Sequence, residues 1–148
     1  MSGDLYDTDI VQWSERQAAL LRRIAAGERV NDQVDWANVV DEVESLGRSE
    51  TRACASLLVQ ALLHDLKMAA WPNSTAVSGW REDARRFRWE AREAFAPSMR
   101  RRLDVARLYA DALRELRRMP QGIDGKAPLP VPEQCPATLD ELLSPDGP

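Results

Sequence analysis

Residues 35–70 read DWANVVDEVESLGRSETRACASLLVQALLHDLKMAA. Their apolar members recur every three or four positions, which places them along one side of an α-helix. This stripe consists of Val39, Val43, Leu46, Cys54, Leu57, Ala61 and Met68. From residue 57 to residue 66 apolar side chains surround most of the helix, so we expect this half to form the centre of the fold. We predict one helix over about residues 36–70, with Asp35 as its N-cap, running through Gly47.

Three further helices are predicted around this one. Thr8 or Asp9 can cap a first helix, which Gly27 would end because glycine tolerates the left-handed conformation. A third helix is expected over residues 78–95, and a fourth from Pro97 to about residue 119, with the proline in its first turn. The side chains expected to face the core are Ile10, Trp13, Leu20, Leu21 and Ile24 in the first helix, Trp80, Ala84, Phe87, Ala91 and Phe95 in the third, and Met99, Leu103, Ala106, Ala110 and Leu113 in the fourth.

The pattern predicts an all-α fold in one domain, as suits a chain of 148 residues. We expect a single helical bundle of four principal helices over residues 1–119, with the long second helix at its centre. Residues 120–148 hold seven of the nine prolines, and we expect a proline-rich tail that packs on the bundle through a short helical turn near residues 138–143. A tail without fixed structure is the alternative.

Composition indicates an ordinary globular protein, with 44% hydrophobic and 30% charged residues. It excludes a disordered chain, a collagen-like chain and a disulfide scaffold. The acidic start, residues 1–4 (MSGD), does not resemble a secretory signal, and no run approaches the roughly 18 apolar residues that span a bilayer. Cys54 and Cys135 lie far apart and form no CxxC motif, so we expect free thiols, a cytoplasmic location and no membrane association.

Charge is distributed unevenly along the chain. Residues 1–50 carry 11 acids and 5 bases, a balance of -6, whereas residues 80–119 carry 12 arginines and 7 acids, a balance of +5. The simplest explanation is that neighbouring helices have faces of opposite charge. The more specific explanation is that the arginine-rich part binds an anionic partner.

A candidate interaction surface lies on the predicted third helix. It consists of Arg81, Arg85, Arg88, Trp89 and Arg92. The arginines share one side of the helix, and three more follow at residues 100–102, an arrangement that can contact the phosphates of nucleic acids. Interspersed acids, the acidic first half or the tail could instead occupy these arginines. Trp89 projects away from the core side, so it could lie under the tail or in a contact between copies.

Two polar residues, Glu50 and His64, lie on the apolar stripe of the long helix and form the candidate buried polar site. A buried charge needs a partner, and a buried histidine is a common base or metal ligand. The two lie about 21 Å apart at ~1.5 Å per residue, so a site at either would need groups from another helix. The simpler alternative is a Glu50–arginine pair and a His64 bonded to a tyrosine or a backbone carbonyl.

Motifs for catalysis and metal binding are missing from the sequence. The chain has one histidine, and residue 61 is Ala, so no Glu-x-x-His pattern forms. No GxSxG, P-loop or GxGxxG motif occurs. Asp41, Glu42 and Glu44 could hold a hard cation, but a solvated helix face explains them more simply. We therefore expect no cofactor, no metal and no catalytic residue.

Several segments together resemble one bacterial family. The densest is DWANVVDEVESLGRS at residues 35–49, and the others are Tyr6, Asp7, Asp9 and Trp13, LLHDLK at residues 62–67, Trp80-Arg81, and CPATLDELL at residues 135–143. Over nearly the whole chain they are similar to the bacterial domain-of-unknown-function family 29. The resemblance implies an all-helical fold and a bacterial source, and it implies no activity. Asp41 and Asp65 depart from the family, which usually has Glu and an apolar residue there.

These observations predict a non-enzymatic protein-interaction module that binds another protein or a second copy of itself. Nucleic-acid binding through the third and fourth helices is the first alternative. An enzyme or ligand-binding site around Glu50 or His64 is the second.

Overall fold

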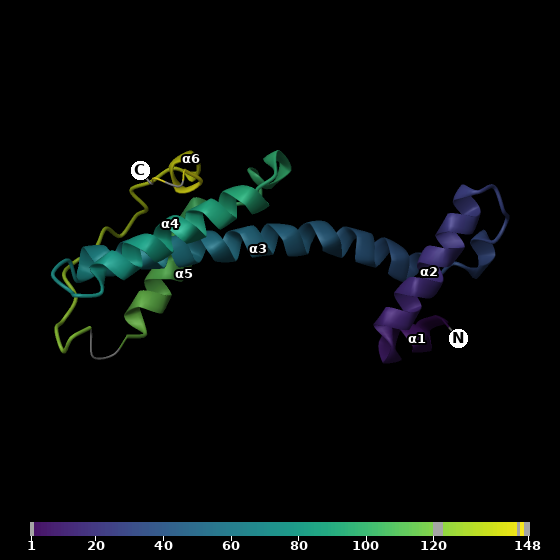
Figure 1. Cartoon of the computed structure of the whole chain (residues 1–148), viewed down its shortest axis with the longest axis horizontal. Coiled ribbons are helices and arrows are strands. Elements are labelled where there is room, and N and C mark those ends of the chain that lie inside the picture. The colour runs from purple at the N-terminus through teal and green to yellow at the C-terminus, as the bar shows by residue number, and fades with distance from the viewer. Residues whose placement is uncertain (1, 120–122, 145, 147–148) are drawn as a thin grey trace. The chain divides into compact units, whose positions relative to one another are not determined.

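The computed structural model describes residues 2–119, 123–144 and 146 (Figure 1). The helices are α1 (Ser2–Thr8), α2 (Ile10–Ala25), α3 (Trp36–Ala70), α4 (Val77–Ala94), α5 (Val105–Arg117) and α6 (Leu139–Leu142), with 3₁₀ turns η1 (Asn31–Gln33) and η2 (Pro97–Met99). Over the described ranges no strand forms, and Ile123 and Lys126 make only an isolated bridge. The all-helical prediction is confirmed.

The chain divides into two compact units, Met1–Arg48 and Ser49–Pro148, with the boundary inside α3. The predicted single helix over residues 36–70 is confirmed. We expected a boundary at residue 119, between a bundle and a tail. The observed units instead meet between Arg48 and Ser49. The reason is that Val39 packs in the core of the first unit, whereas the core of the second unit begins at Cys54.

In the first unit, α2 begins and ends near the predicted residues. The Asp9 side chain accepts a hydrogen bond from the Gln12 backbone N–H at 3.0 Å, and Gly27 adopts a φ of +95° after the helix. A small core consists of Leu20, Val30 and Val34, with Leu21, Ile24 and Val39 packed against it. Ile10 was expected in this core but is 47% exposed.

A polar cluster fixes the start of α3. The Asp35 carboxylate accepts hydrogen bonds from Trp13 Nε1 at 2.9 Å and Asn38 Nδ2 at 2.8 Å. The Asp35 backbone N–H donates to Oε1 of the buried Gln17 at 2.8 Å. The bonds from Asn38 and Trp13 lower the pKa of Asp35. Because these partners belong to α2 and α3, the cluster sets which side of α3 faces α2.

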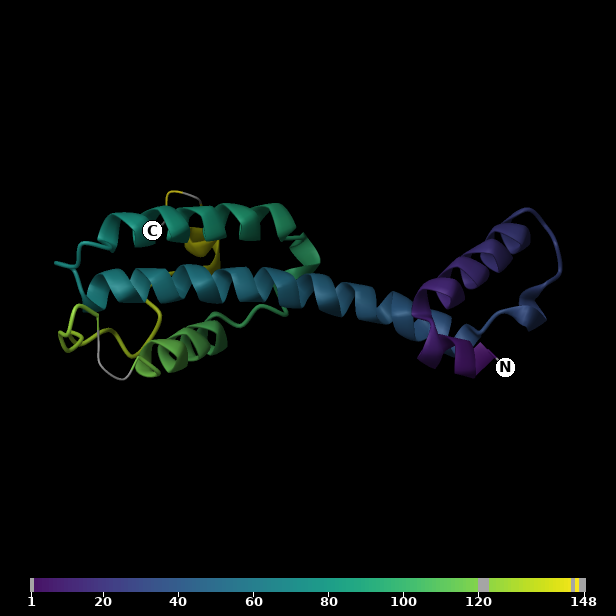
Figure 2. The ribbon, with the colours of Figure 1, turned by 60° about the horizontal axis from the view of Figure 1, so that its bottom comes forward.

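The second unit is built on the later half of α3. Figure 2 shows α4 and α5 running along this half of the helix on different sides. The thiol of the fully buried Cys54 lies 3.4 Å from the Ala91 carbonyl oxygen of α4. The largest core cluster contains, among others, Cys54, Leu58, Leu62 and Leu66 of α3, Ala91 of α4, and Leu108, Tyr109, Ala112 and Leu116 of α5.

Helix α4 lies close to the predicted range, but the fourth helix begins later than expected. Pro97 opens the short η2 turn, and α5 starts at Val105 because the Asp104 side chain accepts a hydrogen bond from the Arg107 backbone N–H at 3.3 Å. Residues 100–102 therefore lie in a connection and not at a helix start. The expected core residues Ala106 and Ala110 are exposed, since the larger Leu108, Tyr109 and Leu116 bury more apolar area on the opposite side.

The described tail residues pack on the second unit. The indole N–H of Trp71 donates to the Lys126 carbonyl at 2.8 Å, and the Leu129 backbone N–H donates to the Ala70 carbonyl at 2.9 Å. The Tyr109 hydroxyl donates to the Pro132 carbonyl. Helix α6, at the position of the expected turn, begins at a capping box and carries the fully buried Leu142. Pro120, Pro145 and Pro148 lie outside the described residues.

Helix α3 is the described helix that is long and apolar enough to cross a membrane, judged by length and composition alone. Its apolar window has a mean hydropathy of 1.2, and 44% of that window is buried inside the fold. Core helices of soluble proteins have the same length and composition, so this is weak support for a membrane span.

Candidate functional site

The early part of α3 presents large apolar side chains to solvent. We call Trp36, Val40, Val43 and Leu46 the α3 row; their exposed fractions are 47%, 50%, 68% and 64%. The spacing of three or four residues keeps them on one side of the helix. Val43 and Leu46 were expected in the core, and the structure corrects that expectation. The sequence could not reveal this, because an exposed stripe and a buried one have the same periodicity.

The place where the core of the first unit ends explains why the row is exposed. Val39 packs against this core, whereas Val43 and Leu46, which follow it along the same side of the helix, are not among the residues packed there. The Trp36 indole N–H donates to the Asn31 carbonyl at 2.7 Å, which holds the ring at the start of the row. The row is therefore anchored at one end by hydrogen bonds.

Acidic side chains and a glycine lie beside the row. Glu44 and Glu50 are exposed at one edge and at the far end. Arg48 Nη1 lies 3.9 Å from the Glu44 carboxylate, and both side chains are more than half exposed, so this pair is weak. A Cβ added at Gly47 would have no atom within 4 Å, so the helix surface is open at this glycine.

Glu50 differs from its expected position in a buried polar site, because it is exposed. The core of the second unit begins only at Cys54, one turn later, and among the described residues none buries Glu50. The structure does not bring Glu50 and His64 together.

His64 is buried between α3 and α4, with 9% of its surface exposed. Its Nδ1 lies 2.7 Å from the Gln60 carbonyl oxygen, which can only accept, so Nδ1 carries the hydrogen. Its Nε2 lies 3.7 Å from the Asp83 carboxylate, and its ring packs against Phe87 at 5.3 Å. This is the backbone-carbonyl arrangement that the sequence offered as the simpler alternative.

Arg88 does not belong to the exposed surface where the sequence placed it. It is 6% exposed, and its Nη1 donates to both oxygens of Asp65 at 3.0 and 2.9 Å. Burial raises the pKa of Asp65, and the attraction of Arg88 only partly offsets this. The Nε of Arg88 has no hydrogen-bond partner within the described chain. Asp65, one of the two departures from the family pattern, is thus the counter-ion of a buried arginine.

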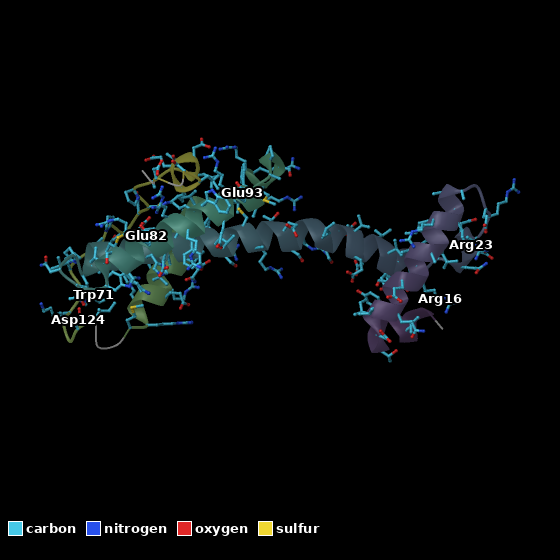
Figure 3. All side chains as sticks on the ribbon, in the orientation of Figure 1. Arg16, Arg23, Trp71, Glu82, Glu93 and Asp124 are labelled. Carbon is cyan, nitrogen blue, oxygen red and sulfur yellow. The ribbon has the colours of Figure 1, made fainter. Side chains whose placement is uncertain are left out.

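The other four members of that surface are exposed on α4. We call Arg81, Arg85, Trp89 and Arg92 the α4 face; Trp89 is 54% exposed. Arg85 Nη2 lies 3.7 Å from the Asp146 carboxylate, with both side chains more than 60% exposed. Figure 3 shows Glu82 and Glu93 projecting from the same helix.

Arginines outside α4 also have acidic partners. Arg100 Nη2 donates to Asp140 of α6 at 2.8 Å, and Arg114 and Arg118 pair with acids three residues earlier on the chain. Such exposed pairs contribute little to stability, but they lower the positive charge available to a polyanion.

Two cavities are lined by described residues of the second unit. One, of about 130 Å³, lies beside Trp71, Ser74 and Asp124, two of which Figure 3 labels at one end of the unit. The other, of about 360 Å³, lies between α5 and the tail, beside Tyr109 and Cys135. Neither is lined by Glu50, by His64 or by the α4 face. Among the described residues, no group of three or more His, Cys, Asp or Glu could hold a metal ion.

The profile of a family described as "Domain of unknown function DUF29" matches residues 5–146. The chain belongs to the DUF29 family. The resemblance seen in the sequence is confirmed.

A solved structure is similar to this DUF29 chain. It is an alpha-helical protein of unknown function from Rhodospirillum rubrum, with a TM-score of 0.70 and 24% sequence identity. The match covers 93% of the DUF29 chain and 88% of the other chain. At this identity the likeness shows the fold alone. A comparison with curated proteins finds no match.

Proposed function

We propose that this DUF29 domain is a non-enzymatic protein-interaction module whose contact surface is the α3 row. The observation that carries the proposal is the exposure of four large apolar side chains, at 47–68%, on one side of one helix. Single folded proteins rarely expose such side chains contiguously, and tryptophan is a frequent anchor of interfaces. The free thiols of Cys54 and Cys135 fit a module that works in the reducing cytoplasm.

Site-specific photo-cross-linking tests this proposal. A benzophenone side chain is placed at Val43 in the full chain, and a matched chain carries it at Ser49, which is exposed on the same helix but off the row. After irradiation in a lysate of the source organism, we expect a discrete protein adduct from position 43 and none from position 49. Equal labelling from both positions, or none from either, would contradict the proposal.

A substitution pair tests the same surface without a probe. Val43→Asp together with Leu46→Asp puts charges into the row, and Ser49→Asp is the control. We expect the double variant to lose the partner that co-purifies with the wild type, at unchanged helicity by circular dichroism. The control should retain it. If the partner still binds the double variant, the contact surface is not the α3 row.

Nucleic-acid binding through α4 and α5 is the second candidate, supported by the exposed arginines of the α4 face. The burial of Arg88 and the acidic partners of Arg85 and Arg100 weaken it. Titration of a fluorescent random duplex at low salt tests it. We expect no salt-dependent binding, and a steep salt dependence would favour this candidate over the first.

An enzyme or ligand site at Glu50 or His64 has the least support. Glu50 is exposed and His64 is engaged by the Gln60 carbonyl. His64→Gln tests this candidate. We expect a loss of stability with unchanged partner binding. Unchanged stability with a loss of partner binding would instead support a functional site at His64.

A further inference from the structure

We propose that the partner of the α3 row is the α4 face of a second copy of this chain. The inference rests on the proposed function and specifies its partner. It joins two exposed surfaces that belong to different units of the chain, Met1–Arg48 and Ser49–Pro148.

The two surfaces match in length. The α3 row with Gly47 occupies residues 36–47, and the α4 face occupies residues 81–92. Each spans about 16 Å at about 1.5 Å per residue. Both advance by steps of three and four residues, which is the spacing that lets two helices pack along a seam. The two helices can therefore lie along each other over their full exposed lengths.

Their charges are complementary. Glu44 and Glu50 lie at the edge and the end of the α3 row, and Asp41 lies further round the helix. The α4 face carries three exposed arginines on one side of its tryptophan, whereas the exposed Glu82 and Glu93 lie on the other side. The partners that Glu44 and Arg85 have in their own chain lie at 3.9 and 3.7 Å and are largely exposed, so they can exchange for partners on another copy. Two α3 rows facing each other would instead bring like charges together.

The apolar side chains of the two surfaces are also complementary. Trp89 is 54% exposed on α4, and on α3 Gly47 carries no side chain, so that a Cβ added there would have no atom within 4 Å. An indole laid on α3 at Gly47 would meet no side chain of residue 47 and would contact Val43 and Leu46, the most exposed members of the row. The contact joins unlike surfaces, so a two-fold dimer makes it twice.

A charge-swap experiment on the full chain tests the inference. One variant reverses the acids (E44R/E50R) and the other reverses the arginines (R85E/R92E). We expect the wild type to form a dimer by sedimentation velocity. Each variant alone should associate at least tenfold more weakly, because its reversed surface meets a like charge on its own copy.

An equimolar mixture of the two variants should restore dimers, since the arginines placed on α3 of one variant face the glutamates placed on α4 of the other. R107E/R114E, two exposed arginines on α5, is the matched control for net charge and should leave the dimer unchanged. All substituted side chains are exposed, and circular dichroism should give equal helicity for every variant.

Three results would overturn the inference. They are a wild type that stays monomeric at high concentration, a dimer that R85E/R92E does not weaken, and an acid-reversed variant that dimerises by itself. The cross-linking at Val43 separates this failure from failure of the proposed function. A monomeric chain whose position 43 labels a different protein overturns the second-copy inference alone, and a monomeric chain without any adduct overturns both.

Discussion

Single residues show where the expectation from the sequence pattern differs from the structure. Asp65 and Arg88 look like ordinary helix-surface residues in the sequence, yet they form a pair in which the arginine is 6% exposed. The neighbours supplied by the fold decide the role of both residues. Gly47 is different, because the sequence predicts one helix through it and α3 confirms this prediction.

Removal of one partner of the buried pair should be costly. Asp65→Asn leaves the Arg88 charge without a counter-ion in a poorly hydrated place, and we expect a loss of about 3 kcal/mol in the free energy of unfolding. The double change Asp65→Leu with Arg88→Met should lose much less, because no charge is then left buried. Urea denaturation of the three chains measures this, and equal losses for both variants would show that the ion pair itself is not the cause.

Gly47→Ala should stabilise the chain by about 0.5–1 kcal/mol, because the glycine is in a helix interior and the new methyl group meets no atom. The shift in urea midpoint, measured on dilute protein to avoid self-association, checks it. A lower midpoint would mean that the backbone at residue 47 is not helical.

The pH dependence of stability should contain a contribution from Asp35. Hydrogen bonds from Asn38 and Trp13 lower its pKa below the ordinary value of 3.8. A depressed pKa contributes stability that is present above the unfolded-state value and is lost as the pH falls through the folded-state pKa. Asp35→Asn should therefore be less stable than the wild type at neutral pH, and the difference should shrink toward pH 3. Urea midpoints between pH 7 and 3 measure it, and a constant difference would contradict this role of Asp35.

At the scale of elements, a capping side chain marks the start of a helix better than a proline does. Proline is common in the first turn of a helix, yet Pro97 opens only η2, whereas Asp104 caps α5. Asp9 and Thr138 cap α2 and α6 in the same manner. The delayed start of α5 goes with a buried side that contains Leu108 and Leu116 in place of the expected alanines.

Asp104→Ala should lower the free energy of unfolding by about 1 kcal/mol, since it removes the acceptor for the Arg107 backbone N–H. Pro97→Ala should have a smaller effect because α5 does not begin there. Denaturation of both variants compares them. A larger loss from the proline change would favour the helix start that the sequence pattern suggests.

At the scale of the whole molecule, α3 joins a small core to a larger one. The buried core cluster of the first unit consists of Leu20, Val30 and Val34, whereas that of the second unit draws on α3, α4, α5 and the tail. Few buried apolar contacts lower the free energy of local opening. The two parts of one continuous helix are therefore expected to differ in stability.

Hydrogen exchange should reveal this difference. Amides of α3 before residue 48 should exchange faster than those between Cys54 and Ala70, in dilute protein followed by mass spectrometry. Raising the protein concentration should slow exchange along the α3 row if a second copy covers it. Uniform protection along α3 would contradict the two-core description.

The sequence by itself determined the all-helical class, the single long helix over residues 36–70, the extents of α2 and α4, and the family. These follow from periodicity, capping residues and local motifs, which depend on neighbours a few positions away in the chain. It also placed Trp89 off the core side, and the structure finds it 54% exposed.

Only the tertiary structure decided which part of each apolar stripe is covered. Val43 and Cys54 belong to the same predicted stripe, yet one is 68% exposed and the other fully buried. The same holds for charge, since Arg88 and Arg92 share a helix side in the sequence but only Arg88 meets a carboxylate from α3. Periodicity fixes the side of a helix on which a residue lies, whereas burial depends on whether a distant part of the chain packs over that side.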